Sequence, residues 1–366
     1  MSRSARPVLL VVEQLRRRVP GGIGTYAAGL ARGLAGLDPG SRPPVRLVAS
    51  RVRGPDPLAA LGLPLETIGV GSRALVKAWD LGALHVGRDA AVVHSVSIVS
   101  PPSAAPLVVT VHDLATVRLP EAFPARGRRW HAAALARAAR RASFVVVPCD
   151  AVADDVRTQV PGLAPDRVVV IEEGSDHLPP ADHRGADALL GRLGIDKGVL
   201  LGVGTLEPRK NLDRLVDAYS RARGRLDEPW PLLVVGPMGW GPHARNLPEG
   251  VVLAGRVPDP VLQALYERCR CLAYVPLLEG FGLPVVEAMR AGAPVVASAV
   301  PSARGAALEV DPLDVDSIAD GLVAASSDEA VRARLVAAGR ARVVGLTWDA
   351  TARAHVELWR RAAEER

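Results

Sequence analysis

The sequence predicts an α/β protein built from two Rossmann-like domains, and three observations lead to this prediction. The 366 residues are enough for two domains with separate hydrophobic cores. Short apolar runs of strand length alternate with longer segments of helical periodicity, which is typical of parallel sheets covered by helices. Glycine-containing segments at 21–24 and 280–282 each follow a predicted strand and precede a predicted helix.

The first domain is expected to span residues 1–172. Its strands are predicted from short, buried apolar runs. These runs lie at 8–12, 46–50, 91–95, 107–111, 144–147 and 168–171. The first glycine segment, which contains Gly22 and Gly24, is expected to form a loop that leads into a helix through Leu30 and Leu34.

The second domain is expected to span residues 173–345, with a polar, proline-bearing lead-in at 177–194. Its predicted strands lie at 199–204, 232–236, 251–255, 272–275 and 295–297. Asp314 and Asp316 form a D-x-D pattern that can bind metal, but their place just before a helical run predicts a helix cap. Residues 346–366 are expected to form a final helix.

The segment at 272–298 is the strongest candidate for a binding site. Gly280 and Gly282 leave the backbone accessible to a ligand, and the helix N-terminus that follows carries unpaired N–H groups and a partial positive charge suited to phosphate. Glu279 precedes the helix and Glu287 lies just beyond its first turn. This arrangement suits a sugar nucleotide, which has hydroxyls on both sides of a diphosphate. A generic strand–loop–helix unit with two solvated glutamates is the alternative.

Arg209 and Lys210 form a second candidate site, directly before a helix that contains Leu215 and Val216. Two cations at a helix N-terminus concentrate positive charge where a diphosphate can bind. They could neutralise the charge that grows on a leaving nucleoside diphosphate without a metal ion. A solvated arginine–lysine pair is the alternative.

His112 and Asp113 directly follow the apolar strand at 107–111. Ligands of open α/β sheets bind outside the carboxyl ends of the strands, so this is a favourable place for a functional side chain. A capping or core histidine is the alternative, and Asp113 could serve only to orient the loop.

Composition argues against several classes of protein. No apolar run reaches the roughly 18 residues of a membrane-spanning helix, and the first residues have no signal-peptide pattern. The 3 cysteines include no CxxC pair, and the pair Cys269 and Cys271 has no second pair to complete a metal site, so buried reduced thiols are expected. These features predict a cytoplasmic protein.

The net charge of +6 is carried mainly by arginine. A predicted basic helix near 126–141 has arginines among alanines, together with Trp130. Such a helix could lie on anionic lipid, which predicts peripheral membrane contact; a solvated face in an arginine-rich protein is the alternative. The chain has no recognisable nucleic-acid-binding motif, so no nucleic-acid partner is expected.

The segment E-G-F-G-L-P-V-V-E at 279–287 resembles the E-x7-E motif of retaining glycosyltransferases of family 4, which have the GT-B fold. Three further segments resemble elements of this family: V-T-V-H-D-L at 109–114, E-P-R-K-N at 207–211 and G-x-V-x-D at 255–259. The resemblance covers nearly the whole chain. It implies two Rossmann-like domains that face each other across a cleft, with the C-terminal helix crossing back to the first domain.

The resemblance also implies roles for individual residues. Glu279 and His112 are expected to contact the donor sugar, and Glu287 the nucleotide ribose. The residues expected to act in catalysis are His112, Glu279, Lys210 and Arg209. Those expected to bind the donor are Gly22, Gly24, Gly204, Gly255, Gly280, Phe281, Gly282, Leu283 and Glu287.

Several positions depart from the family pattern. Thr25 and Thr205 stand where many members have arginine, so the charge contacts of those arginines are missing. Glu172 and Glu173 occupy a place that commonly reads P-N-G. The loop at 300–305 is shorter than usual, which leaves its contacts undefined.

These features predict a retaining glycosyltransferase that moves a hexose, with mannose from GDP-mannose preferred, to a hydroxyl of a glycan or lipid-linked acceptor. No cofactor and no metal are expected. A UDP- or dTDP-sugar donor is the alternative within the class, and a non-catalytic sugar-nucleotide-binding protein is another. A nicotinamide-dependent oxidoreductase is not supported, because neither glycine segment has the G-x-G-x-x-G spacing.

Overall fold

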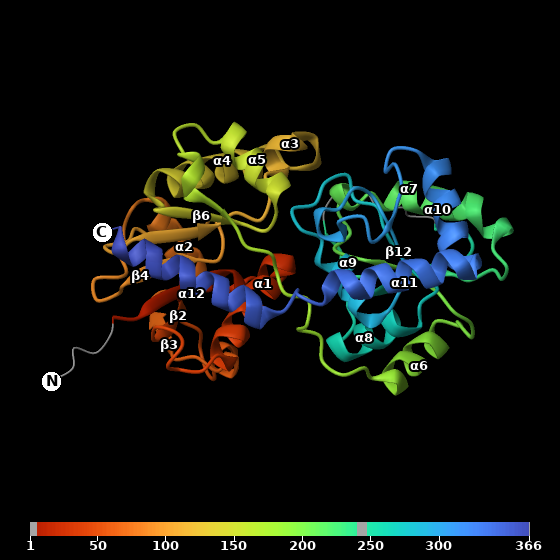
Figure 1. The fold of residues 1–366 in the computed structure, drawn as a ribbon, viewed down its shortest axis with the longest axis horizontal. Coiled ribbons are helices and arrows are strands. Elements are labelled where there is room, and N and C mark those ends of the chain that lie inside the picture. The colour runs from red at the N-terminus through yellow and green to blue at the C-terminus, as the bar shows by residue number, and fades with distance from the viewer. Residues whose placement is uncertain (1–5, 240–246, 366) are drawn as a thin grey trace. The chain divides into compact units, whose positions relative to one another are not determined.

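The computed structural model describes residues 6–239 and 247–365 and shows two compact units (Figure 1). The first unit contains the residues up to Gly174 and those from Leu346 onward, and the second runs from Ser175 to Gly345. Each unit is a parallel sheet with helices on its faces, as the alternating pattern of the sequence predicts.

The boundary between the units falls after Gly174, slightly later than the expected position at residue 172. Glu173 lies in the first unit because its carboxylate contacts His112. Gly174 lies against the last helix, where a Cβ would stand 2.4 Å from the backbone nitrogen of Trp348. The two residues are therefore held by first-unit contacts.

The first unit has a seven-stranded parallel sheet, counted over the described residues, in the order β3-β2-β1-β4-β5-β6-β7. The strands are β1 (Val8–Val11), β2 (Val45–Ser50), β3 (Leu65–Ile68), β4 (Val92–Ser95), β5 (Leu107–Thr110), β6 (Phe144–Val147) and β7 (Val168–Val170). All but β3 coincide with the predicted apolar runs. The sequence pattern does not reveal β3 because this edge strand is only half-buried or exposed.

Helices cover both faces of this sheet. One face packs against α1 (Gly21–Gly36) and α12 (Trp348–Glu364). The other packs against α2 (Ser72–Asp80), α4 (Ala125–Arg141) and α5 (Asp150–Gln159). A short helix, α3 (Ala115–Arg118), follows β5.

The C-terminal helix α12 belongs to the first unit, as expected. Two glycines of α1 make room for it: a Cβ on Gly29 would lie 2.2 Å from the Trp348 ring, and one on Gly33 would lie 2.4 Å from the Trp348 carbonyl oxygen. Because these positions lack side chains, Trp348 packs directly on the α1 backbone.

The expectation of a glycine loop at 21–24 is wrong, because α1 begins at Gly21. Gly22 and Gly24 therefore lie in its first turn. Gly21 has φ 63°, in the left-handed region, and a Cβ on Gly24 would stand 2.2 Å from Cβ of Pro20. Glycine lets the chain turn tightly from Pro20 directly into the helix.

The second unit has a six-stranded parallel sheet in the order β10-β9-β8-β11-β12-β13, again over the described residues. The strands are β8 (Leu200–Val203), β9 (Leu232–Val235), β10 (Val251–Gly255), β11 (Cys271–Tyr274), β12 (Val295–Ala297) and β13 (Leu308–Glu309). The prediction located all of these except β13, which is too short to show a pattern.

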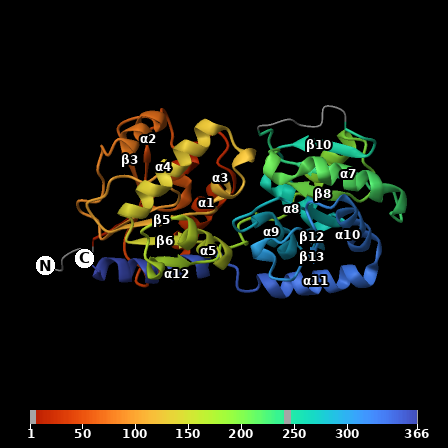
Figure 2. The same cartoon turned by 90° about the horizontal axis from the view of Figure 1, so that it is seen from above.

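The helices of the second unit are arranged around these strands (Figure 2). They are α6 (His183–Arg192), α7 (Leu212–Ala222), α8 (Asp259–Arg268), α9 (Leu283–Ala291), α10 (Val315–Ser327) and α11 (Glu329–Val343). In this sheet β8 lies between β9 and β11, so the chain order reverses between β8 and β11. Such a switch point, at the carboxyl ends of the strands, is where open α/β sheets bind ligands.

Candidate active site

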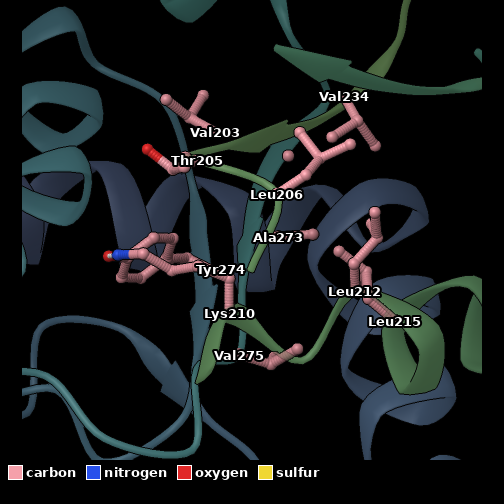
Figure 3. Close-up of a pocket in the computed structure, with 12 residues that line it drawn as sticks. Val203, Thr205, Leu206, Lys210, Leu212, Leu215, Val234, Ala273, Tyr274 and Val275 are labelled. Carbon is pink, nitrogen blue, oxygen red and sulfur yellow. Dashed lines mark hydrogen bonds between the residues drawn. The ribbon is translucent and has the colours of Figure 1, made fainter. Parts of the chain in front are cut away.

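A small cavity lies where β8 and β11 end (Figure 3). Its lining includes Gly204 and Thr205 after β8, Lys210 from a 3-10 helix (Pro208–Lys210), and Tyr274 at the end of β11. The Lys210 ammonium stands 5.0 Å from the centre of the Tyr274 ring. A Cβ on Gly204 would lie 3.5 Å from Cε of Lys210, so the lysine stem packs against the glycine backbone.

Glu279 joins the two predicted cations in one cluster. Its Oε1 accepts hydrogen bonds from Lys210 Nζ at 2.6 Å and from Arg209 Nη1 at 2.7 Å. Lys210 Nζ also donates to Tyr274 Oη at 2.7 Å. Burial raises the pKa of Glu279, but the charges of Lys210 and Arg209 outweigh burial and hold the pKa below its usual value. The carboxylate is therefore ionised, and the prediction that these residues act together has a geometric basis.

Glu207 is a further member of this cluster to which the sequence pattern assigned no role. It is buried, and its Oε1 accepts from Arg209 Nη2 at 2.9 Å and from Arg209 Nε at 3.2 Å. Arg209 is therefore held on one side by Glu207 and on the other by Glu279. The signal for Glu207 was its place in E-P-R-K-N, two residues before the arginine.

Asn211 fixes the cationic segment to the rest of the sheet. It adopts φ 59°, in the left-handed region, between the 3-10 helix and α7. Its side-chain amide donates to the carbonyl oxygens of Val275 at 3.0 Å and Pro312 at 2.7 Å. The backbone N–H of Leu277 in turn donates to the Arg209 carbonyl at 2.9 Å. These bonds hold the loops after β8 and β11 side by side.

The glycine loop ends at Gly282, which has φ 98° and caps α9. A Cβ on Gly282 would stand 2.2 Å from Cγ1 of Val300. The short loop that was expected to depart from the family pattern supports this turn, since Ser302 Oγ donates to the Gly282 carbonyl at 3.0 Å and Ser302 N donates to that of Phe281 at 3.0 Å. Phe281 and Leu283 are buried.

Glu287 lies on α9 and has partners of its own. Tyr266 Oη donates to its Oε2 at 2.9 Å, and His177 Nε2 lies 3.0 Å from its Oε1. Burial, followed by the Glu287 charge, raises the pKa of Tyr266 well above 10, so the phenol remains a donor. Sequence reasoning missed both partners, because no local spacing links them to Glu287.

His112 lies in the first unit, just after β5. Its Nδ1 is 3.1 Å from Oε1 of Glu173, and its Nε2 is 3.0 Å from the carbonyl oxygen of Val96. The ring also meets Tyr26 edge-on, with centroids 4.7 Å apart. Asp113 accepts from the backbone N–H of Ala115 at 2.9 Å, which is the loop-orienting role considered for it.

The remaining predicted donor-binding glycines occupy less crowded surroundings. Gly22, in the first turn of α1, has no neighbour within 4 Å of an added Cβ. Gly255 ends β10 with φ 66° and also has open space at its Cβ position. The next residues, from Arg256 to Asp259, line an open hollow. The residues around Gly22 and Gly255 do not indicate which ligand, if any, these glycines contact.

Two other sequence predictions concern local features. Asp314 caps α10, since its side chain accepts from the backbone nitrogens of Asp316 and Ser317, which confirms the helix-cap interpretation.

Cys269 and Cys271 are buried, as predicted, and burial raises the pKa of Cys271 to about 12. Across residues 6–239 and 247–365, no group of three metal-ligating side chains is found, and no helix is long and apolar enough to cross a membrane.

Comparison with known proteins places the two halves in one enzyme family. Residues 191–342 match the model described as glycosyl transferases group 1, and residues 20–177 match glycosyltransferase family 4. The chain is 31% identical to O-antigen chain mannosyltransferase B of Escherichia coli over 66% of this chain and 67% of that protein. It is also 31% identical to a D-inositol 3-phosphate glycosyltransferase of Kineococcus radiotolerans, over 56% of this chain and 54% of the relative.

A solved structure shares the fold. Anabaena Alr3699/HepE, in complex with UDP and glucose, aligns with a TM-score of 0.71 over 97% of this chain and 100% of that chain, at 19% sequence identity. The family models match successive halves, and the alignment with the mannosyltransferase spans two thirds of that relative. The chain therefore belongs to the family 4 glycosyltransferases, enzymes with two Rossmann-like domains in the GT-B fold.

Proposed function

We propose that this enzyme is a retaining hexosyltransferase that moves mannose from GDP-mannose to a hydroxyl of a glycan or lipid-linked acceptor. The cluster of Lys210, Arg209 and Glu279 at the switch point of the second unit carries this proposal. Two cations and a carboxylate at a switch point suit the binding of a sugar diphosphate, which supports the proposal. The choice of mannose is supported by the mannosyltransferase from Escherichia coli.

The predicted residues of the second-unit cluster and of α9 have roles in this proposal. Lys210, Arg209 and the N-terminus of α9 bind the diphosphate, and Glu279 binds the sugar hydroxyls. Glu287, held by its two neighbours, accepts from the ribose hydroxyls. Because Phe281 and Leu283 have buried side chains, their contribution to the donor comes from the backbone.

The proposed reaction breaks the bond between the anomeric carbon and the leaving diphosphate oxygen. The acceptor oxygen bonds to the same face of that carbon, and its proton passes to the leaving phosphate. The step therefore uses neither a protein nucleophile nor a metal ion. Lys210 and Arg209 stabilise the negative charge that develops on the leaving group.

A UDP-sugar is the second candidate donor, because the structurally similar Anabaena protein was solved with UDP and glucose. A thermal-shift screen of the purified protein against GDP, UDP, dTDP and NAD, each with its sugar conjugates where they exist, tests both. A ligand at about 100 times its Kd adds about 2.7 kcal/mol of stability. A response to GDP and GDP-mannose supports the proposal, a response to UDP or dTDP overturns the choice of mannose, and a response to NAD alone overturns the transferase assignment of the site.

We also propose that α4 contacts anionic lipid. Arg126, Arg129, Arg140 and Arg141 are exposed on this helix. Trp130 is not available for insertion, since its indole N–H donates to Asp80 at 2.9 Å. Co-sedimentation with phosphatidylglycerol vesicles, compared with phosphatidylcholine vesicles, tests this contact; equal binding of the wild type and an Arg126→Glu/Arg129→Glu variant contradicts it.

A further inference from the structure

Glu173 is one of two glutamates that depart from the family pattern. It follows β7 and is buried, with 3% of its surface exposed. Its Oε1 lies 3.1 Å from Nδ1 of His112. The departure from the pattern therefore coincides with a direct contact to a predicted site residue.

Both ring nitrogens of His112 face hydrogen-bond acceptors. Nε2 lies 3.0 Å from the Val96 carbonyl oxygen, which accepts hydrogen bonds and cannot donate them, so Nε2 carries a proton. Nδ1 lies 3.1 Å from the Glu173 carboxyl, and when that carboxyl is ionised it only accepts hydrogen bonds, so Nδ1 then carries a second proton. With Glu173 ionised, this arrangement is that of an imidazolium paired with a carboxylate.

The other groups around His112 agree with this charge state. Tyr26 of α1 meets the ring edge-on, at an interplanar angle of 80°, and fixes its plane. Asp113, on the same loop, adds a negative charge, while His94 of β4 is kept neutral because burial lowers its pKa well below 6.5. Burial also lowers the pKa of His112, but Glu173, the backbone carbonyl and Asp113 outweigh it and raise the pKa above 6.5.

We propose that Glu173 is a positioning residue that keeps His112 doubly protonated and fixed in its plane, and that it thereby sets the upper pH limit of sugar transfer. The activity part of this inference rests on the proposed function and on the expectation, from the family resemblance, that His112 contacts the donor sugar. A doubly protonated imidazole has no free lone pair. His112 therefore acts as a fixed positive charge rather than as a general base.

The protonation of His112 can be measured without any substrate. In the full chain labelled with 15N-histidine, a His112→Gln variant identifies the signal among the 8 histidines, and exposed His85 is the reference within the same spectra. The wild type is expected to lose the second proton of His112 at higher pH than that of His85. Glu173→Gln is expected to lower the midpoint of His112 by about one pH unit or more, the scale of losing an opposite charge.

Glu172→Gln, a change at the neighbouring glutamate, is the matched control and should leave the midpoint of His112 in place. A wild-type midpoint at or below that of His85 overturns the proposal, even if no variant folds. An unchanged midpoint in Glu173→Gln also overturns it.

The pH dependence of transfer from GDP-mannose separates positioning from a merely structural role. In Glu173→Gln, the pH at which kcat falls on the alkaline side should be lower by about one unit, and activity should recover at acidic pH. In Glu173→Asp, kcat should fall at the same alkaline pH as in the wild type. A loss of kcat that is equal at every pH overturns the proposal. If the wild type transfers no sugar, the proposed function fails, while the histidine titration still decides the role of Glu173.

Discussion

A buried polar cluster of the second unit and a buried polar network of the first unit are built in opposite ways. The second unit holds a cluster of charges, in which Lys210 and Arg209 share the carboxylate of Glu279. The first unit holds a network of neutral groups between its sheet and its helices. This network consists of His94, Thr110, Tyr26, His355 and Trp359.

In the neutral network each side chain after Trp359 accepts a hydrogen bond from one neighbour and donates one to the next. The Trp359 indole can only donate, so it donates to Nδ1 of His94 at 3.3 Å, and His94 Nε2 then donates to Thr110 at 2.9 Å. Thr110 donates to Tyr26 Oη at 3.1 Å, and Tyr26 donates to His355 Nε2 at 2.8 Å. The other nitrogen of His355 donates to a backbone carbonyl of α12 at 2.8 Å. Every ring nitrogen is thus satisfied without a net charge.

The difference separates two uses of buried polar residues. A neutral network whose partners are all inside the protein holds elements together, here α12 against the sheet. A charged cluster at the ends of strands can exchange its internal partner for a ligand. Changes to the two regions should accordingly affect stability in the first unit and turnover in the second.

The largest expected effect comes from His355→Ala. It removes the acceptor of the Tyr26 hydroxyl and leaves a cavity beneath α12, so we expect a loss of about 4 kcal/mol in the unfolding free energy of the first unit. Denaturant unfolding followed by tryptophan fluorescence measures it. Arg353→Ala, at an exposed position on the same helix, should cost no more than about 0.5 kcal/mol; similar losses for both variants contradict the role of the network.

Acid should weaken the first unit through the same residue. Burial outweighs the hydrogen bond to the Thr351 carbonyl and lowers the pKa of His355 to about 4. The histidine of the unfolded chain binds a proton below about pH 6.5, whereas the folded His355 stays neutral until about pH 4. The contribution of His355 to the unfolding free energy is therefore complete above pH 6.5 and falls by about 3 kcal/mol as the pH drops to 4. Unfolding measured from pH 7 to 4 should show this fall, and a shallower fall is expected in His355→Phe.

In the second unit, Lys210→Ala and Glu279→Ala should each lower turnover by about 100-fold or more, the scale of losing a charge-stabilising group. Both variants should retain the thermal stability of a folded enzyme. Lys197→Ala is the control, since Lys197 is exposed and pairs with Glu228. Wild-type turnover in both cluster variants would remove the basis for this site.

Smaller changes in stability should distinguish the glycine segment before α9 from the one that begins α1. Gly282→Ala is expected to cost about 2 kcal/mol, because φ is 98° and the new Cβ would meet Val300. Gly22→Ala should be neutral or stabilising by up to about 1 kcal/mol, since it lies in a helix with open space around it. Melting temperatures of the two variants should therefore move in different directions, and equal shifts would show that the segments are equivalent.

The local features of the fold could be predicted because each depends on neighbouring residues. The strands β6, β10 and β12 coincide with their predicted apolar runs. The cap at Asp314 and the helix end at Gly292, which has φ 83°, were readable from residue type and position. The prediction of a loop at the glycine segment of α1 was wrong, because glycine is equally compatible with a loop and with a tight turn into a helix.

The candidate site was predictable only in part. The sequence placed Arg209 and Lys210 before one helix and Glu279 before another, and the parallel sheet brings these loops to the same edge. It did not reveal that Tyr266 and His177 hold Glu287, because segments far apart in the chain contribute them.

By itself, the sequence determined most of the succession of strands and helices, the cap at Asp314 and the motifs of a family 4 glycosyltransferase, because these depend on local patterns. Only the tertiary structure decided the charge states. His112 and His355 are the same residue type, yet one faces a carboxylate and the other is enclosed in a neutral network. Their pKa values move in opposite directions because contacts from distant segments fix the electrostatic surroundings of each ring.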